Sequence, residues 1–450
     1  MSVISLEFLC FYLLTLIIYW MMPQKYKNFI LLVASWIYLA SWNVLFLFYL
    51  IAVILISWLM GRYISKDSDN RYVKYIELGF ALIILLTGLV LVKYTSFIVE
   101  VLGVSFFTFQ AISYIVDVYR KDINGEKDFI TYAIYVSFFP QLLCGPISKS
   151  KEQISRYKSV KVFDLENVEK SWVIVIYGVF LKLVIADRIA IYVDYVYSNM
   201  SKIGKLSILI AILLYSIQIY CDFAGYSLIA IGLASTFGIV LPVNFRQPYF
   251  AESISDFWKR WHISLTSWFR EYLYIPLGGN RKGSIRTYVN ILIVFVISGI
   301  WHGAGMTFVL WGLLHGLFQV AERYFKLAKY RYRIVTYLLV SLLWVMFRAD
   351  DLNQALAILS GMFTNSGNNV LETINNCGLG VHNIIVLFIA IVVVLVIDNI
   401  QNNCKDVLGW LWNQRTLFKW IILYAIIFAI MIFGIYGPGY DSTQFIYYQF

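Results

Sequence analysis

Residues 287–321 read TYVNILIVFVISGIWHGAGMTFVLWGLLHGLFQVA, and these 35 residues contain no Asp, Glu, Lys or Arg. A second charge-free run covers residues 28–61. At about 1.5 Å per residue, each run can form a pair of helices about as long as a bilayer is thick. Because lipid offers the backbone no hydrogen-bond partners, such spans form helices. The two runs therefore predict an all-α, polytopic membrane protein.

The composition of the whole chain supports the same class. Hydrophobic residues make up 60% of the chain and charged residues 14%, and the mean hydropathy is +0.73. A soluble domain carries nearer a quarter of charged residues. We attribute the net charge of +10 to Lys and Arg in the loops on the cytoplasmic side of a membrane, where such residues are enriched. We therefore expect no nucleic-acid partner. Five scattered cysteines without a CxxC pair predict neither a metal site nor a disulfide framework.

Apolar segments predict about 11 to 13 transmembrane helices in a single membrane-embedded domain over residues 1–450. The segments are 4–22, 28–42, 44–61, 76–97, 128–146, 172–192, 206–221, 287–301, 306–321, 334–347, 384–400 and 417–436. Two further pieces, 100–118 and 224–241, cannot both cross simply, and we predict that they are re-entrant or buried. The Lys/Arg-rich loop 322–333 is placed in the cytoplasm, and the loop 348–382 outside.

Residues 253–275, SISDFWKRWHISLTSWFREYLYI, have apolar side chains at three-and-four spacing, which predicts one amphipathic helix. Ser253 followed by Asp256 resembles a capping signal at its start. A helix that anchors the fold at the membrane interface is one interpretation. His262, however, falls on the apolar face, where an imidazole needs a partner or a chemical task.

His302 lies in the middle of the charge-free run, 16 residues after Arg286 at the cytoplasmic surface. That separation is about 24 Å of helix, which is less than the hydrocarbon thickness. The turn Gly303-Ala304-Gly305 is therefore expected inside the protein, and an ionisable group at such depth suggests a functional site. A core histidine bonded to a backbone carbonyl is the alternative, and it is favoured for His315 and His382.

No paired Cys and His, GxSxG elbow or HExxH motif is present in the sequence, so no protease or hydrolase is indicated. Histidine without a metal or a local nucleophile suits general-base activation of a hydroxyl. Acyl transfer across the bilayer fits this chemistry. A proton-coupled transporter or flippase, and a structural scaffold for polysaccharide export, stay open as alternatives at this point.

Several segments resemble the membrane-bound O-acyltransferase family, in particular the branch of the alginate O-acetylation membrane subunit. They are GVSFFTFQAISYIVDVYR, FFPQLLCGPI, CDFAGYSLIAIGLA, PVNFRQPYFAESISDFWKRWHISLTSWFREYLYIPLGGNRKG, RTYVNI, GIWHGAGMTFVLWGLLHG, WVMFRADDLNQAL and the terminal FIYYQF. The resemblance covers nearly the whole chain. The segment YIPLGGN favours this branch over the sister branch that transfers D-alanine to teichoic acid. In CDFAGYSLIAIG, Leu228 stands where an acidic residue is expected.

The resemblance implies a ring of helices around a central funnel, with re-entrant and interfacial helices and a histidine-bearing core at about 221–321. His302 matches the family histidine, and His262 matches the second histidine of the bacterial branch. Both are then catalytic. An acetyl group would come from cytoplasmic acetyl-CoA and pass, through an extracytoplasmic acetyltransferase partner, to a surface or secreted polysaccharide.

The same resemblance places the chain in the cytoplasmic membrane of a bacterium, in contact with lipid. Alginate biosynthesis and peptidoglycan O-acetylation are both compatible with it. Three basic residues are candidates to attract the phosphates of CoA by charge alone, and a solvated basic face is an equally open interpretation. These residues are Lys259, Arg260 and Arg270.

Overall fold

The computed structural model describes residues 1–66, 71–95, 103–143, 145–330, 332–403 and 406–436. Within these ranges the regular structure is helical, and two isolated backbone bridges join residues 203–204 to residues 366–368. The described part of the chain thus confirms the all-α prediction. The terminal FIYYQF segment, residues 445–450, lies outside the described residues.

Six of the described helices are long and apolar enough to cross a membrane. They are Val44–Ile64, Tyr72–Tyr94, Lys205–Thr236, Ser284–His302, Val381–Asn402 and Thr416–Phe433. Two shorter apolar helices, Leu6–Met21 and Val104–Tyr119, accompany them. A multi-pass membrane protein follows, as the sequence predicted. The expected number of about 11 to 13 spans is larger, and the ring of helices around a funnel stays a prediction.

The chain divides into two compact units, of which the first contains residues 1–175 and 227–243. Its helices are α1 (Leu6–Met21), α2 (Gln24–Ala40), α3 (Val44–Ile64), α4 (Arg71–Tyr94), α5 (Val104–Tyr119), α6 (Phe129–Ser137), α7 (Phe139–Leu142), α8 (Ser150–Lys158) and the first part of α9 (Leu165–Phe180). Its core includes aromatic rings from distant segments, with Tyr12 edge-on to Phe237 at 5.6 Å between centroids. The single domain predicted over 1–450 stays a prediction.

Two predictions fall in the first unit. The piece 100–118 corresponds to α5, whose side chains are almost all buried, as expected for a buried segment, although residues 96–102 lie outside the description. The predicted span 128–146 is wrong as a single helix. It breaks at Phe138, where ψ is 111°, and Pro140, the second residue of the short helix α7, has no backbone N–H to donate. Both short helices are mostly buried.

The second unit contains residues 176–226 and 244–440. Its elements are the end of α9, η1 (Leu181–Ala186), α10 (Asp187–Ser198), η2 (Met200–Lys202), most of α11 (Lys205–Thr236), η3 (Pro248–Phe250), α12 (Ile254–Arg260), α13 (Ile263–Phe269), η4 (Arg270–Tyr274), α14 (Ser284–His302), α15 (Met306–Tyr324), η5 (Leu327–Tyr330), α16 (Arg333–Arg348), α17 (Leu352–Thr364), α18 (Val370–Asn376), α19 (Val381–Asn402), α20 (Val407–Trp412) and α21 (Thr416–Phe433). Every predicted site residue belongs to this unit.

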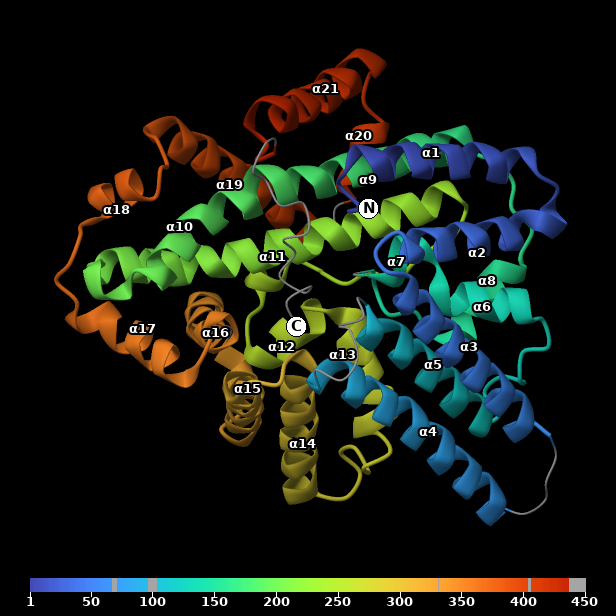
Figure 1. The fold of residues 1–450 in the computed structure, drawn as a ribbon. Helices are drawn as coiled ribbons and strands as arrows, with labels where there is room; N and C mark the ends of the chain where they lie inside the picture. The colour runs from blue at the N-terminus through green and yellow to red at the C-terminus, as the bar shows by residue number, and fades with distance from the viewer. Residues whose placement is uncertain (67–70, 96–102, 144, 331, 404–405, 437–450) are drawn as a thin grey trace. The chain divides into compact units, whose positions relative to one another are not determined.

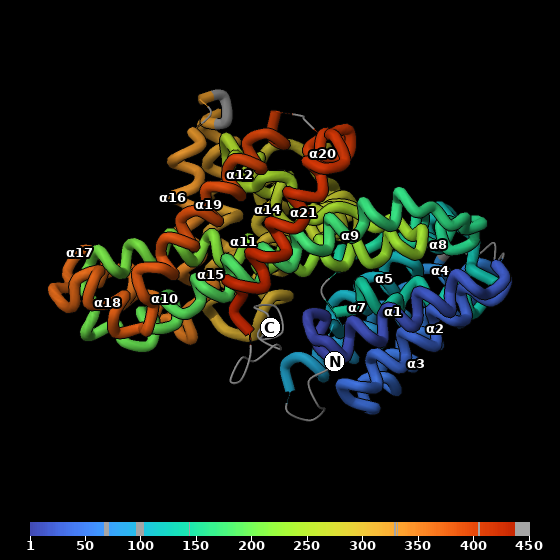
Figure 2. The backbone as a smooth tube through the Cα atoms, turned by 90° about the horizontal axis from the view of Figure 1, so that it is seen from above, coloured from blue at the N-terminus to red at the C-terminus, as the bar shows by residue number. Residues whose placement is uncertain are grey.

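One more prediction needs correction in these helices, and the placement of 348–382 outside the membrane stays a prediction. The segments 206–221 and 224–241 are one helix, α11, which continues through Thr236 for 32 residues, so the second segment is not a separate re-entrant piece. At 1.5 Å per residue this helix is about 48 Å long. The expected outer loop 348–382 contains α17 and α18, and α18 lies beside α10 (Figure 2).

The helices α14 and α15 form a tight antiparallel hairpin (Figure 1). A Cβ atom at Gly312 would lie 2.2 Å from the carbonyl oxygen of Phe295, and one at Gly299 would lie 2.3 Å from that of Phe308. Because such distances exclude any side chain, the two backbones touch through these glycines, as membrane helices often do. The hairpin thus holds the end of α14, which carries His302, at a fixed position.

Candidate active site

His302 is the last residue of α14, where the extended conformation of Gly303 ends the helix. Only 2% of the residue is exposed. Its ring lies edge-on to three aromatic rings, with centroid distances of 4.8 Å to Trp301, 5.1 Å to Trp311 and 5.3 Å to Phe347. The predicted location, deep in the protein at the start of a glycine turn, is confirmed.

His262 is buried as predicted, but the continuous helix predicted over 253–275 is wrong. The stretch is divided into α12, α13 and the π-helical turn η4, and His262 stands at the break as the N-terminal cap of α13. Its φ of 43° and ψ of 52° lie in the left-handed region, which costs an L-residue conformational energy. The capping signal is confirmed, because Asp256 N donates to Ser253 Oγ at 3.1 Å.

A neighbouring segment holds this break in place. Ile263 N donates to the carbonyl oxygen of Asn244, and Arg246 N donates to that of Arg260, both at 2.9 Å. The side chain of Asn244 also accepts a 2.5 Å hydrogen bond from Ser264 Oγ. These contacts compensate for the backbone conformation of His262. The sequence gives no local signal for them, because the partners lie some twenty positions apart.

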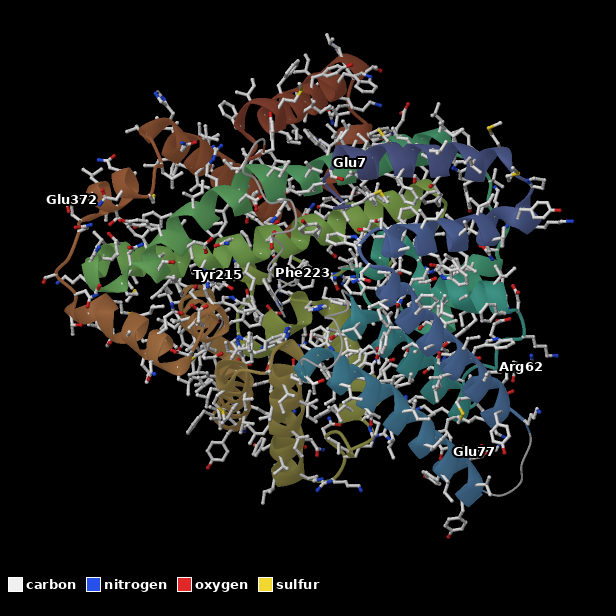
Figure 3. All side chains as sticks on the ribbon, viewed as in Figure 1. Glu7, Arg62, Glu77, Tyr215, Phe223 and Glu372 are labelled. Carbon is white, nitrogen blue, oxygen red and sulfur yellow. The ribbon has the colours of Figure 1, made fainter. Side chains whose placement is uncertain are left out.

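The tertiary structure brings the two predicted histidines to the same indole. The ring centroid of Trp301 is 4.8 Å from that of His302 and 6.2 Å from that of His262. The ring centroid of His262 also lies 4.7 Å from that of Phe223. Figure 3 labels Phe223 on α11. Burial lowers the pKa of His262, which lies outside the six candidate spans, to about 3. That imidazole is therefore neutral at physiological pH.

A cavity of about 820 Å³ opens beside the histidines, between α12, α13, α14 and α15. It is lined by Ser253, Ser255, Trp258, Lys259, Leu265, Thr266, Phe269, Arg270, Tyr274, Ile291, Val294, Phe295, Ser298, Gln319, Glu322, Arg323 and Lys326. Ser298 lies one helical turn before His302, and Thr266 lies one turn after His262. Neither histidine is among these lining residues.

Four exposed basic side chains line this cavity: Lys259, Arg270, Arg323 and Lys326. The one carboxylate among the lining residues, Glu322, accepts hydrogen bonds from the backbone N–H groups of Ile254 at 2.7 Å and Ser255 at 3.3 Å. Its charge is thereby directed at the start of α12. The cavity therefore combines an apolar interior with cations suited to phosphate groups.

The three basic candidates from the sequence therefore differ in their position relative to the cavity. Lys259 and Arg270 line the cavity, whereas Arg260 does not. The guanidinium of Arg260 contacts Asp256 at 2.9 Å and Asn402 at 2.6 Å. Arg323 and Lys326, in contrast, were interpreted from the sequence only as part of a basic loop. Their proximity to α12 and α13 depends on the return of the chain through the α14–α15 hairpin.

A buried ion cluster lies behind Phe223. Lys182, on the π-helical turn η1, contacts Asp187 at 2.8 Å and Asp222 at 2.7 Å. Its ammonium group also lies 5.4 Å from the ring centroid of Tyr226. Because Asp222 precedes Phe223 on α11, this cluster fixes the part of the helix that packs against His262. The sequence analysis did not single out Lys182.

Within the described residues, no group of three or more His, Cys, Asp or Glu side chains is arranged to hold a metal ion. The chemistry that the site's own side chains can supply is proton transfer by imidazole and recognition of an anionic ligand by cations.

Comparison with known proteins gives the family. The model of the membrane-bound O-acyltransferase family matches residues 1–348. The chain is 32% identical to a probable alginate O-acetylase of Pseudomonas putida, over 96% of each chain. It is 35% identical to a peptidoglycan O-acetyltransferase of Helicobacter pylori, over 74% of this chain and 73% of that protein.

A teichoic acid D-alanyltransferase of Streptococcus thermophilus is 27% identical over 62% of this chain and 70% of its own length. The sequence similarity is therefore higher and more extensive towards the O-acetylating relatives than towards this one. The match over residues 1–348 includes the helices that carry both histidines and line the cavity. This multi-pass membrane protein belongs to the membrane-bound O-acyltransferase family and is an O-acyltransferase.

Proposed function

We propose that the protein transfers an acetyl group from cytoplasmic acetyl-CoA, across the membrane, to hydroxyl groups of a cell-surface or secreted polysaccharide. The observation that carries this proposal is the cavity of about 820 Å³, which has cations among its lining and also includes Ser298, one helical turn before His302. The names of the alginate and peptidoglycan O-acetylating relatives support acetyl as the transferred group.

The basic side chains of the cavity suit the donor. CoA carries several phosphate groups, and Arg270 and Arg323 can form charge-assisted hydrogen bonds with phosphate oxygens. The apolar interior then receives the thioester arm. Lys259 remains a candidate for the same role. Arg260 has no part in it, because its guanidinium is directed at Asp256 and Asn402.

His302 acts as the general base in this proposal. Its imidazole takes the proton of the attacking hydroxyl as the new bond forms between oxygen and the acetyl carbonyl carbon. The carbon–sulfur bond breaks, and the same proton passes to the departing CoA sulfur. His262, whose ring also lies near Trp301, assists as the partner imidazole in acyl transfer. Positioned proton transfer of this kind contributes about 10²- to 10⁴-fold to a rate.

The acceptor lies on the other side of the membrane, so we further propose an extracytoplasmic acetyltransferase that receives the acetyl group before the polysaccharide does. The membrane is then the cytoplasmic membrane of a bacterium. Basic loops such as 322–333 support the orientation in which the cavity cations face the cytoplasm.

The test replaces His302 with Gln in a strain whose only copy of the gene is the variant. His302→Gln retains a polar side chain but removes the base, so alkali-labile acetate on surface and secreted polymers should fall at least 100-fold. The matched control is His382→Gln, because His382 is exposed on α19. The control should leave acetylation unchanged. Immunoblotting of membranes and thermal melting check that both variants insert and fold.

Two results would reject the proposal. Normal acetylation in a folded His302→Gln protein would remove the histidine from the chemistry. D-alanine esters in place of acetate, lost in the same variant, would reassign the donor to the chemistry named for the teichoic acid relative. A proton-coupled transporter would instead show substrate uptake that needs no acyl donor.

A further inference from the structure

Trp258 forms part of the cavity wall from within α12. Only 6% of the residue is exposed. Its indole is edge-on to three rings, with centroid distances of 5.2 Å to Phe295, 5.7 Å to Trp311 and 5.0 Å to His315. Trp311 in turn contacts His302 at 5.1 Å. Trp258 and Trp311 thus stand in sequence between the cavity and the His302 ring.

His315 fixes the orientation of this indole. Trp258 Nε1 donates to His315 Nδ1 at 3.2 Å, and His315 is fully buried. The His315 ring lies nearly parallel to Phe257 and Phe295, at interplanar angles of 7° and 18°. Because the acceptor ring is held by both phenyl rings, the indole that donates to it has little freedom to rotate. This assigns a task to a histidine for which the sequence favoured a structural role.

The polarity of the cavity indicates which part of the donor meets Trp258. Arg323 lies in the last turn of α15 and Lys326 follows that helix, whose end pairs with the start of α14 in the antiparallel hairpin. Along α14 the lining continues through Phe295 to Ser298, towards His302. A donor whose phosphates lie on Arg323 and Lys326 therefore directs its acyl group towards the part of the cavity lined by Trp258, Phe295 and Ser298.

We propose that Trp258, held by His315, closes the acyl end of the cavity and restricts the donor to short acyl groups, so that acetyl is accepted and butyryl or longer groups are rejected. The inference rests on the proposed function, because it assumes an acyl-CoA donor. The physical cause is steric. A longer chain would have to displace an indole that is packed on three sides and hydrogen-bonded to a fixed partner.

The experiment compares Trp258→Phe with Trp344→Phe in the full chain, purified and reconstituted in lipid nanodiscs with acetyl-, propionyl- and butyryl-CoA and with a soluble oligosaccharide that supplies the acceptor hydroxyl. Both variants exchange an indole for a smaller phenyl ring in the same buried aromatic cluster, but only Trp258 lines the cavity. The readout is kcat/KM for release of the CoA thiol with each donor. One methylene in a tight apolar pocket changes this value about 10- to 200-fold.

Trp258→Phe should raise the ratio of kcat/KM for butyryl-CoA to that for acetyl-CoA at least tenfold, and Trp344→Phe should leave the ratio unchanged. His315→Phe keeps an aromatic ring but removes the acceptor nitrogen, so it should shift the ratio in the same direction. Competition of each acyl-CoA against bound radiolabelled acetyl-CoA gives a second measurement that needs no turnover. If Trp258→Phe folds but is inactive, the competition measurement tests the inference. If Trp258→Phe does not fold, His315→Phe tests it instead.

The inference would be overturned if Trp258→Phe changed neither the kcat/KM ratio nor the competition between acyl-CoAs while the unmodified protein still used acetyl-CoA. If Trp258→Phe does not fold, the same two results in His315→Phe would overturn it. An equal shift in Trp344→Phe would also overturn it, because the effect would then come from general loosening of the aromatic cluster. Failure of the proposed function is a different result. In that case the unmodified protein neither binds acetyl-CoA nor releases CoA from any donor.

Discussion

Replacing Lys182 with Met should destabilise the protein far more than removing an ion pair of the same length at the surface. The Lys182 ammonium group lies 2.8 Å from Asp187 and 2.7 Å from Asp222, and the side chains of Lys182 and Asp222 are each 2% exposed. Lys170, on the same continuous helical stretch, contacts Glu166 at 2.7 Å, but these side chains are 35% and 62% exposed. The two lysines therefore differ in burial and in the number of carboxylates that they contact.

Burial sets the magnitude. Removing one partner of a buried ion pair leaves an uncompensated charge in a medium of low dielectric constant, which costs about 3–5 kcal/mol. Water screens the pair of Lys170, so Lys170→Met should cost less than about 1 kcal/mol. For a unit of this size, about 2–4 °C of melting temperature is lost per kcal/mol, so Lys182→Met should melt about 6–20 °C lower.

The assay is thermal melting of the purified, detergent-solubilised protein, followed by tryptophan fluorescence and by recovery of the monodisperse peak in size-exclusion chromatography. The double variant Lys182→Met with Asp222→Asn removes one of the two carboxylates and should recover part of the loss. Equal melting temperatures for Lys182→Met and Lys170→Met would refute the reasoning. So would a double variant less stable than Lys182→Met alone.

Two further predictions concern catalysis. Asn244→Ala loses the hydrogen bond from Ser264 and loosens the backbone break at His262. The kcat should therefore fall about tenfold with little change in KM for acetyl-CoA. Asn244→Asp keeps the acceptor oxygen and should restore kcat. A raised KM at unchanged kcat would contradict that positioning role. Arg270→Gln should raise KM for acetyl-CoA about tenfold, because a charge-assisted hydrogen bond to the donor is lost. Arg260→Gln should leave this KM unchanged. Equal effects of the two variants in steady-state kinetics would contradict a role of Arg270 in the donor site.

The membrane class and the position of His302 could be predicted from the sequence because both depend on local properties. A charge-free run of 35 residues is long enough for two membrane helices, and the glycine turn after His302 interrupts it at one place. The hairpin of α14 and α15 therefore appears where it was expected. The spacing of Ser253 and Asp256 likewise predicted a cap, because a cap involves only neighbouring residues.

Predictions failed where long-range contacts outweigh local preference. The apolar periodicity of 253–275 favours one helix, but hydrogen bonds from the segment around Asn244 stabilise a left-handed His262 and divide it. The apolar stretch of α11 was read as two segments, yet it forms one helix whose side chains are buried along most of its length. Periodicity indicates which face of a segment is apolar. It carries no information about which distant backbone groups will form hydrogen bonds with the residues at a helix break.

The sequence by itself determined that this chain is a helical membrane protein with histidines in apolar surroundings, because hydropathy and glycine placement act over a few residues. Only the tertiary structure decided that His262 and His302 meet at Trp301, that Arg270 and Arg323 line one cavity while Arg260 does not, and that Trp258 is held by His315. The physical reason is that these contacts join residues far apart in the chain. They exist only after helices pack, when burial energy has compensated for the entropy of bringing them together.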